Sequence, residues 1–230
     1  MKKKYALTDE TMELCGITLH RIKALIDFND VKAGDLGGWI ETEDNLSHYG
    51  NAWVYGNAWV SDEAEIFGDA RVYGNARVYG NAKIFGNAQA GGNAMVYGNA
   101  RVGSNAWVYG NACVYGNALV YGDAEIYGNA LVFGDAWVFG NAEVGGDARV
   151  NSNRDYIVFR DWWDSGSWRH FTWTRSNDKW KAGDFYGTGD ELINRAYKHS
   201  ETSGREYARV VEYVNQIKKN KLLENKKNSK

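Results

Sequence analysis

The chain has 230 residues, and it combines 27 glycines, 15 tyrosines and 10 tryptophans with no proline at all. This composition excludes a disordered linker and is unlike that of an ordinary globular domain. The net charge of −2 excludes a strong bulk attraction to nucleic acid or to a membrane. The charge is nevertheless uneven, at −3 for residues 1–48, −4 for residues 49–150 and +5 for residues 151–230.

Two further absences in the sequence bear on location and chemistry. No apolar run reaches the roughly 18 residues of a membrane-spanning helix, and no apolar signal core follows the basic start. We therefore expect a soluble, non-secreted protein in the cytoplasm. Cys15 and Cys113 have no Cys or His at metal-ligand spacing, which predicts free thiols, no metal site and no cofactor.

Residues 1–48 are predicted to form an N-terminal β cap. Strands are expected over residues 4–8 and 18–25, with turns at Asp9-Glu10 and Cys15-Gly16. Such a cap has a physical purpose if a stack of strands follows, because an uncovered strand edge invites end-to-end polymerisation.

Residues 49–150 are a six-residue repeat of the type Val-Tyr-Gly-Asn-Ala-X. Alanine recurs at every sixth position from Ala52 to Ala148, and Val or Ile follows two positions later in every hexad except one, where Ala90 stands instead. Because strand side chains alternate, the Ala and the Val or Ile point inward while X points outward. The remaining Gly, Asn and Asp residues tolerate positive φ and suit a corner. Each hexad is therefore one side of a triangular coil.

Three hexads close a coil of 18 residues, so the repeat corresponds to about 5.7 coils stacked at the spacing of neighbouring strands. Residues 18 apart then form columns, and the Asn and Asp side chains at the corners can form ladders. Ile40 and Leu46 fall on the alanine register, which places the start of the first coil near residue 40. Glu63, after Asp62, is expected to be a local irregularity.

Residues 151–220 are predicted to form a small α+β module of three strands and two helices. The strands are expected over residues 155–161, 169–176 and 179–185, and capping boxes mark helix starts at Thr188 with Glu191 and at Ser203 with Glu206. Residues 221–230 read as a frayed basic tail.

The hexads resemble those of the left-handed parallel β-helix, and this resemblance, which covers about 45% of the chain, is what implies left-handedness. The fold class expected is thus an all-β solenoid of about six coils with an N-terminal cap and an α+β C-terminal module. The leader GDLGGWIE (residues 34–41), the repeat, and the ending from FTWTRSNDKW (171–180) through FYGTGDELI (185–193) together resemble uncharacterised phage and prophage proteins of Gram-positive bacteria. That likeness implies a viral accessory role in the cytoplasm of a bacterial host.

Catalytic chemistry finds little support in the repeat. Hexapeptide acyltransferases of this fold use a catalytic His and usually a loop that interrupts the coils, whereas residues 49–150 contain neither. His48 lies where the repeat starts and is either a general base or a capping residue, and we favour the latter. The sequence Gly187-Thr188-Gly189 is read as a helix-capping turn and not as a phosphate-binding loop. We therefore predict no catalytic residues and no enzyme.

The remaining hypotheses concern binding by residues on the surface. Large apolar residues at outward positions predict a partner or oligomer face: Trp53, Trp59, Met95, Trp107, Leu131 and Trp137. Basic and aromatic residues in the C-terminal module predict contact with nucleic acid or with a partner, although a core that needs large aromatics also explains the tryptophans: Arg169, Trp173, Arg175, Lys179 and Lys181.

The function predicted is that of a non-enzymatic phage or prophage protein that blocks a host antiviral defence, for example a CRISPR nuclease, by protein or protein–nucleic-acid contact. Expected partners are further copies of the chain and a host protein or its nucleic-acid complex, and no membrane. Two alternatives remain open: a sponge that holds a nucleotide signal in pockets between subunits, and an acyltransferase that uses His48.

Overall fold

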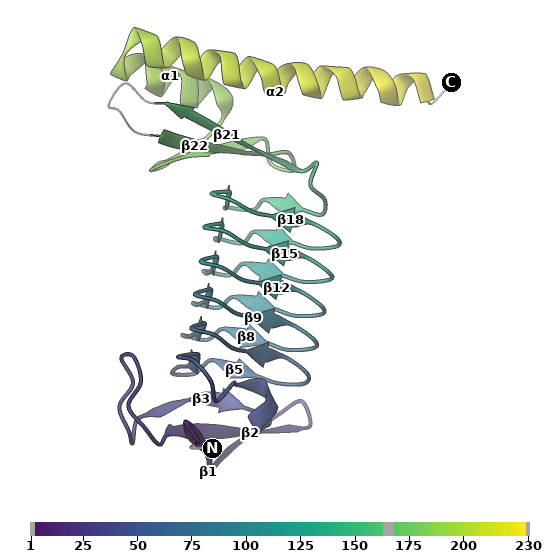
Figure 1. Ribbon diagram of the computed structural model, residues 1–230. Helices are drawn as coiled ribbons and strands as arrows, with labels where there is room; N and C mark the ends of the chain where they lie inside the picture. Colours follow the sequence, from purple (N-terminus) through teal and green to yellow (C-terminus); the bar gives the residue numbers. More distant parts are fainter. Residues whose placement is uncertain (1–2, 163–167, 229–230) are drawn as a thin grey trace. The chain divides into compact units, whose positions relative to one another are not determined.

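A computed structural model describes residues 3–162 and 168–228 (Figure 1). The chain folds into two compact units. The first comprises residues Met1–Tyr156 and Arg175–Asn177, and the second comprises Ile157–Thr174 and Asp178–Lys230. We call them the β-helix unit and the C-terminal unit.

The coils of the β-helix unit place their short strands in three parallel sheets (Figure 1). The sheet called here the β5 sheet contains β5 (Trp59–Val60), β8 (Arg77–Val78), β11 (Met95–Val96), β14 (Cys113–Val114), β17 (Leu131–Val132) and β20 (Arg149–Val150). The β4 sheet contains β4 (Trp53–Val54), β7 (Arg71–Val72), β10 (Gln89–Ala90), β13 (Trp107–Val108), β16 (Glu125–Ile126) and β19 (Glu143–Val144). The β6 sheet contains β6 (Glu65–Ile66), β9 (Lys83–Ile84), β12 (Arg101–Val102), β15 (Leu119–Val120) and β18 (Trp137–Val138).

The registers of these sheets confirm the predicted coil of 18 residues. Gln89 pairs with Arg71 on one side and with Trp107 on the other, and Ala90 pairs likewise with Val72 and Val108. Every repeat alanine from Ala52 to Ala148 is buried, as is every Val or Ile that follows two positions later. The hydrophobic interior is therefore built from one small and one branched side chain per coil side, which confirms the predicted solenoid.

Corners of the coils depend on residues that adopt positive φ. Glycine occupies this position in nearly every hexad, while Asp62 (φ 55°) and Ser104 (φ 59°) replace it twice. Asp62 keeps the corner because its backbone N–H donates to the Glu41 carboxylate (2.7 Å) and its own carboxylate accepts from the Gly80 N–H (2.9 Å). The irregularity predicted at Glu63 is thus limited to the replacement of the corner glycine by Asp62.

Ladders of side-chain amides run along the corners, as predicted. One such ladder runs from Asn75 through Asn93 and Asn111 to Asn129, and each of the first three donates its amide Nδ2–H to the Oδ1 of the next at 3.0 to 3.1 Å. Aromatic rings stack in the same way, with Tyr79, Tyr97 and Tyr115 at centroid separations of 4.9 Å. These contacts satisfy polar groups and bury ring faces at positions that would otherwise be exposed turns.

The cap consists of β1 (Tyr5–Leu14), β2 (Ile17–Ala24), β3 (Leu36–Ile40) and the 3-10 helix η1 (Glu43–Asn45). Strands β1, β2 and β3 pair antiparallel, and β3 then pairs in parallel with β5, so the cap continues the β5 sheet. The turn predicted at Asp9-Glu10 is wrong, because β1 runs through it with a register shift between Leu7 and Thr11. A bulge absorbs the irregularity without ending the strand.

The first coil begins near residue 40, as predicted, but in a different register. Ile40 pairs with Val60 and Leu46 with Ile66, so these residues occupy the Val position and not the Ala position. From Trp53 onward the offset is 18 residues, because Trp53 pairs with Arg71 and Val54 with Val72. The corner between Leu46 and Ala52 therefore contains two additional residues relative to the later coils.

The C-terminal unit contains a four-stranded sheet of β21 (Tyr156–Trp162), β22 (Trp168–Thr174), β23 (Lys179–Ala182) and β24 (Phe185–Gly187), with helices α1 (Gly189–His199) and α2 (Glu201–Asn228). The prediction of three strands was wrong because Gly183, at φ 57°, splits the third into two. Phe171, Trp173, Trp180, Leu192 and Val211 are among the residues of its core.

The boundaries of the two helices differ in part from the predicted ones. Thr188 caps α1, as predicted, with its Oγ1 accepting from the Glu191 N–H (3.3 Å). Helix α2 begins at Glu201, so Ser203 lies inside it and is buried. The backbone of residues 221–228 continues α2, which corrects the predicted frayed tail. No helix in the described ranges is long and apolar enough to cross a membrane.

Candidate functional site

The outward positions of the β5 sheet form one column, as the 18-residue spacing predicts. Register pairs connect Trp59 to Arg77, Arg77 to Met95, Met95 to Cys113 and Cys113 to Leu131. Three of the six predicted face residues, Trp59, Met95 and Leu131, therefore lie on this sheet, and each of them is partly exposed.

A groove of about 370 Å³ lies where the hairpin of β1 and β2 meets this face. Leu14, Cys15 and Ile17 contribute the hairpin side, and Trp59 and Met95 contribute the sheet side. The Trp59 ring stacks on Tyr79 at 5.7 Å, which fixes the indole against the sheet. Arg77 and Asp62 supply charge at the groove, so it offers an apolar surface with polar groups beside it. We call it the hairpin groove.

Three other predicted face residues lie elsewhere. Trp107 projects from the β4 sheet with 43% of its surface exposed, and Trp137 projects from the β6 sheet with 53% exposed. Trp53 is only 1% exposed, which corrects its assignment to an exposed face. Tyr5 and Phe28 of the cap pack edge-on against its ring at 6.0 and 5.3 Å. A column position at the end of the solenoid thus becomes interior once the cap folds over it.

The basic and aromatic residues predicted in the C-terminal part do not form one patch. Trp173 is 1% exposed and its indole Nε1 donates to Asp178 (2.8 Å), so it is a core residue and not a contact residue. Arg175 belongs to the β-helix unit, and its N–H donates to Asp155 O (2.8 Å). Lys179 and Lys181 alternate along β23 with the buried Trp180 between them, and the Lys181 ammonium donates to Gly183 O.

His48 has the environment of a capping residue. Its ring stacks on Tyr5 at 4.3 Å, its Nδ1 lies 3.3 Å from the Lys4 backbone N, and its Nε2 lies 3.5 Å from the Glu43 carboxylate. Both ring nitrogens therefore face groups of the cap, which leaves no nitrogen directed at a substrate. The Glu43 pKa is lowered, chiefly by the hydrogen bond from Lys3 and less by the one to His48.

Other reactive side chains in the coils are few. Cys113 is buried on the β5 sheet, and desolvation raises the pKa of its thiol, which disfavours the nucleophilic thiolate. Among residues 3–162 and 168–228, no group of three His, Cys, Asp or Glu side chains could hold a metal ion.

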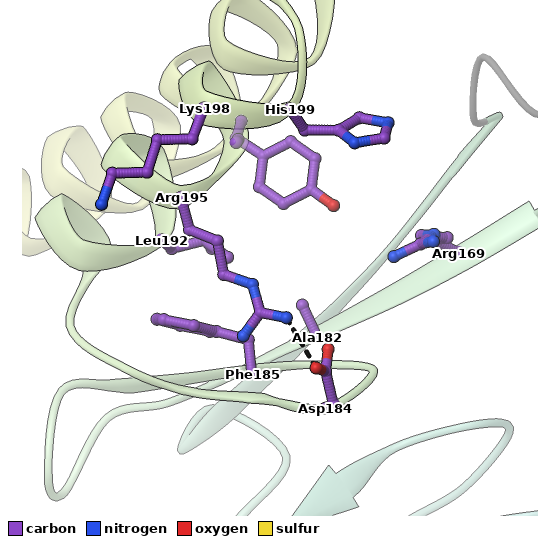
Figure 2. A pocket seen from close by; sticks show the side chains of 10 residues that line it. Arg169, Ala182, Asp184, Phe185, Leu192, Arg195, Lys198 and His199 are labelled. Carbon is purple, nitrogen blue, oxygen red and sulfur yellow. Dashed lines mark hydrogen bonds and ion pairs between the residues drawn. The ribbon is translucent and has the colours of Figure 1, made fainter.

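A second cavity, of about 420 Å³, lies within the C-terminal unit (Figure 2). We call it the C-terminal pocket. Arg169 of β22 lines it together with Arg195, Lys198 and His199 of α1, and Asp184 contributes a carboxylate. Arg169 was predicted from the sequence to be a contact residue, whereas the three helix residues were not. The available signal was their spacing, because positions three and four apart share one face of a helix.

The fold and these sites define a parallel β-solenoid protein with hexapeptide coils, a β cap and an added α+β unit. A family model described as the YdcK β-solenoid repeat matches residues 70–83, 88–104 and 124–140. The protein of Escherichia coli (strain K12) called "Uncharacterized acetyltransferase YdcK" is 38% identical over 60 residues, which is 23% of this chain and 18% of that protein. The match therefore spans less than a fifth of that protein's length. The segments matched by the family model lie within the coils, so they support the β-helix.

Proposed function

We propose that this chain is a non-catalytic binding protein whose coils hold a rigid recognition surface for another protein. The hairpin groove carries the proposal, because it brings the predicted face residues Trp59 and Met95 together with Leu14 and Ile17 of the cap. Tryptophan and methionine are enriched at the centres of protein interfaces, where partly exposed apolar surface is buried on association.

The chemistry of the groove favours an apolar segment of a protein as the occupant. Arg77 lies in the same column, between Trp59 and Met95, and it can pair with an acidic residue beside that segment. The uninterrupted hydrogen bonds between coils make the surface rigid, which reduces the entropic cost of binding. An apolar segment flanked by a carboxylate is thus the partner feature that fits best.

Within this proposal, the finer hypothesis is that the protein serves a phage or prophage and blocks a host antiviral defence, such as a CRISPR nuclease. This hypothesis rests on the resemblance to phage and prophage proteins that we infer from residues 34–41, the repeat and residues 171–193. The positive charge of residues 151–230 also suits a nucleoprotein partner, whose RNA or DNA presents phosphates.

Met95→Glu is expected to weaken partner binding by roughly 30-fold or more, the effect of losing an interface hot spot. The variant adds a charge that must be desolvated when a partner fills the groove, while the partly exposed position of Met95 lets the free protein tolerate it. The measurement is how strongly each variant inhibits target cleavage, and it is made with every nuclease of a CRISPR panel. Gln89→Glu, at an outward position of β10, adds the same charge outside the groove and is expected to behave like the wild type. Equal inhibition by Met95→Glu and the wild type would exclude the groove.

Self-association is the other protein contact that we propose. If a second copy fills the hairpin groove, Met95→Glu converts the oligomer into a monomer in light scattering coupled to size-exclusion chromatography. If the oligomer persists in that variant, the copies meet through another face, and Trp107 and Trp137 are the exposed aromatic residues to replace next.

Acyl transfer is the second candidate function, and the printed name of the Escherichia coli relative is the observation that favours it. The surroundings of His48 argue against it, because the ring is stacked on Tyr5 and faces Glu43 and the Lys4 backbone. We expect no binding of acetyl-CoA at millimolar concentration in a calorimetric titration. Binding that disappears in His48→Gln, with the fold retained, would reverse this assignment.

A further inference from the structure

We infer that the C-terminal pocket binds a small phosphate-bearing ligand of mononucleotide size. The inference stands apart from the proposed function, because the pocket lies wholly in the C-terminal unit and the hairpin groove wholly in the β-helix unit. Its volume of about 420 Å³ falls in the range of small-molecule sites, which is roughly 300 to 1,000 Å³.

Two layers of different chemistry make up the pocket wall. The inner layer is apolar and buried, and it consists of Ala182, Leu192, Ala196 and Tyr207. The outer layer is charged and exposed, and it consists of Arg169, Asp184, Arg195, Lys198 and His199. A ligand that fits both layers has a weakly polar part for the inner wall and an anionic group for the rim.

The rim carries excess positive charge. Arg169, Arg195 and Lys198 are cationic at neutral pH, and among the described residues that line the pocket Asp184 is the only carboxylate. The Arg195 guanidinium donates to Asp184 at 2.6 Å, and this hydrogen bond is the main cause of the lowered pKa of Asp184. The Asp184 carboxylate is therefore held by Arg195, while Lys198 on the same rim adds a further positive charge.

Arg195 makes two contacts that leave it able to bind a phosphate as well. Its guanidinium lies 5.9 Å from the centroid of the Phe185 ring, and one of its terminal nitrogens contacts Asp184. A guanidinium has five N–H donors, so further donors remain for a second anion. Figure 2 shows Arg169 on the strand side of the pocket and Arg195 on the helix side, and arginine is a strong hydrogen-bond donor to phosphate.

Stabilisation of the helix end explains only part of this cluster. Lys198 and His199 lie in the last turn of α1, where cations interact favourably with the helix dipole. Arg169 lies on β22, and Arg195 lies one turn earlier on α1, so neither arginine is explained in this way. Their position at the rim of an apolar-lined cavity is what points to an anionic ligand with a weakly polar part.

Calorimetric titration of the full chain with AMP, adenosine and inorganic phosphate tests the inference. We expect AMP to bind, and adenosine to bind at least about ten-fold more weakly because it lacks the phosphate. Arg195→Gln is expected to weaken AMP binding about ten-fold or more. Arg209→Gln removes the same charge from an exposed site on α2, where Arg209 contacts Glu206, and it is expected to leave the affinity within about two-fold.

Two further measurements identify the source of the phosphate and provide a control for misfolding of the variants. Oligonucleotides with and without a 5′-phosphate show whether the phosphate belongs to a free nucleotide or to the end of a strand. Tighter binding of the phosphorylated oligonucleotide would support the site and identify a strand end as its ligand. Lys198→Gln, at an exposed position, provides a second pocket variant if Arg195→Gln does not fold. The inference is overturned if no phosphate compound binds at millimolar concentration, if adenosine binds as well as AMP, or if Arg209→Gln weakens binding as much as the pocket variants.

Discussion

Gly122→Ala is expected to lower the free energy of unfolding of the β-helix unit by about 2 to 5 kcal/mol. Gly122 has a φ of +76°, a conformation that costs an L residue about 1 to 2 kcal/mol. A Cβ at this position would also lie 2.8 Å from the backbone N and O of Gly140 in the next coil. Because that neighbour is backbone held by the coil hydrogen bonds, relief of the clash adds about 1 to 3 kcal/mol.

Gly140→Ala separates the two contributions. Gly140 has nearly the same φ, +67°, but a Cβ there would meet nothing within 4 Å. Its loss of stability is therefore expected to be the conformational cost alone, about 1 to 2 kcal/mol. Gly56→Ala, near the other end of the coils, has a nearest contact of 3.8 Å and serves as a second control. Denaturant unfolding followed by circular dichroism gives the comparison, and equal losses in all three variants would show that coil stacking is looser than described.

The stability of the wild-type protein is expected to rise with pH between about 8 and 10.5 relative to that of Lys4→Met. Lys4 is only 1% exposed, and its ammonium donates to Ala52 O at 2.8 Å under the ring of Phe28. Desolvation lowers the pKa of this group from 10.5 to about 8, partly opposed by the charge of Asp69. In this pH window the unfolded chain binds a proton that the folded protein has lost, so folding is favoured as pH rises.

The expected gain follows from the size of that shift and amounts to about 3 kcal/mol across the window. The raised pKa values of Cys113 and Tyr5 act in the opposite direction, because these groups ionise earlier in the unfolded chain. Lys4→Met retains both groups, so the difference between the two proteins isolates the lysine. Melting temperatures of each protein from pH 7 to 10 provide the measurement, and parallel curves would contradict the assignment.

Periodic features of the fold were predictable because each hexad repeats the same local chemistry. Gln89 and Trp107 pair as the 18-residue spacing predicts, because identical corners return the chain to the same sheet after every three hexads. The first coil departs from this pattern, because the corner between Leu46 and Ala52 contains two more residues. Ile40 matches the alanine spacing only through that insertion, which no periodicity in the sequence reveals.

The sites were less predictable because they join segments that are distant in the chain. Trp53 and Trp59 have identical hexad contexts, yet the cap buries Trp53 and leaves Trp59 partly exposed. The hairpin groove needs Leu14 and Ile17 beside Met95, and the C-terminal pocket needs Arg169 beside Arg195. Such contacts depend on how the cap and the helices pack. The pattern of the sequence predicts only which face of a strand or helix a residue occupies.

The central claim, that the protein acts by binding and not by catalysis, is tested most directly by titrating it against each nuclease of a CRISPR panel. We predict that inhibition of one nuclease saturates at about one equivalent of the protein, or of its oligomer. The degree of inhibition is expected not to increase with incubation time. Substoichiometric loss of nuclease activity that grows with time and requires acetyl-CoA would contradict the claim. Absence of inhibition across the whole panel would contradict the proposed target.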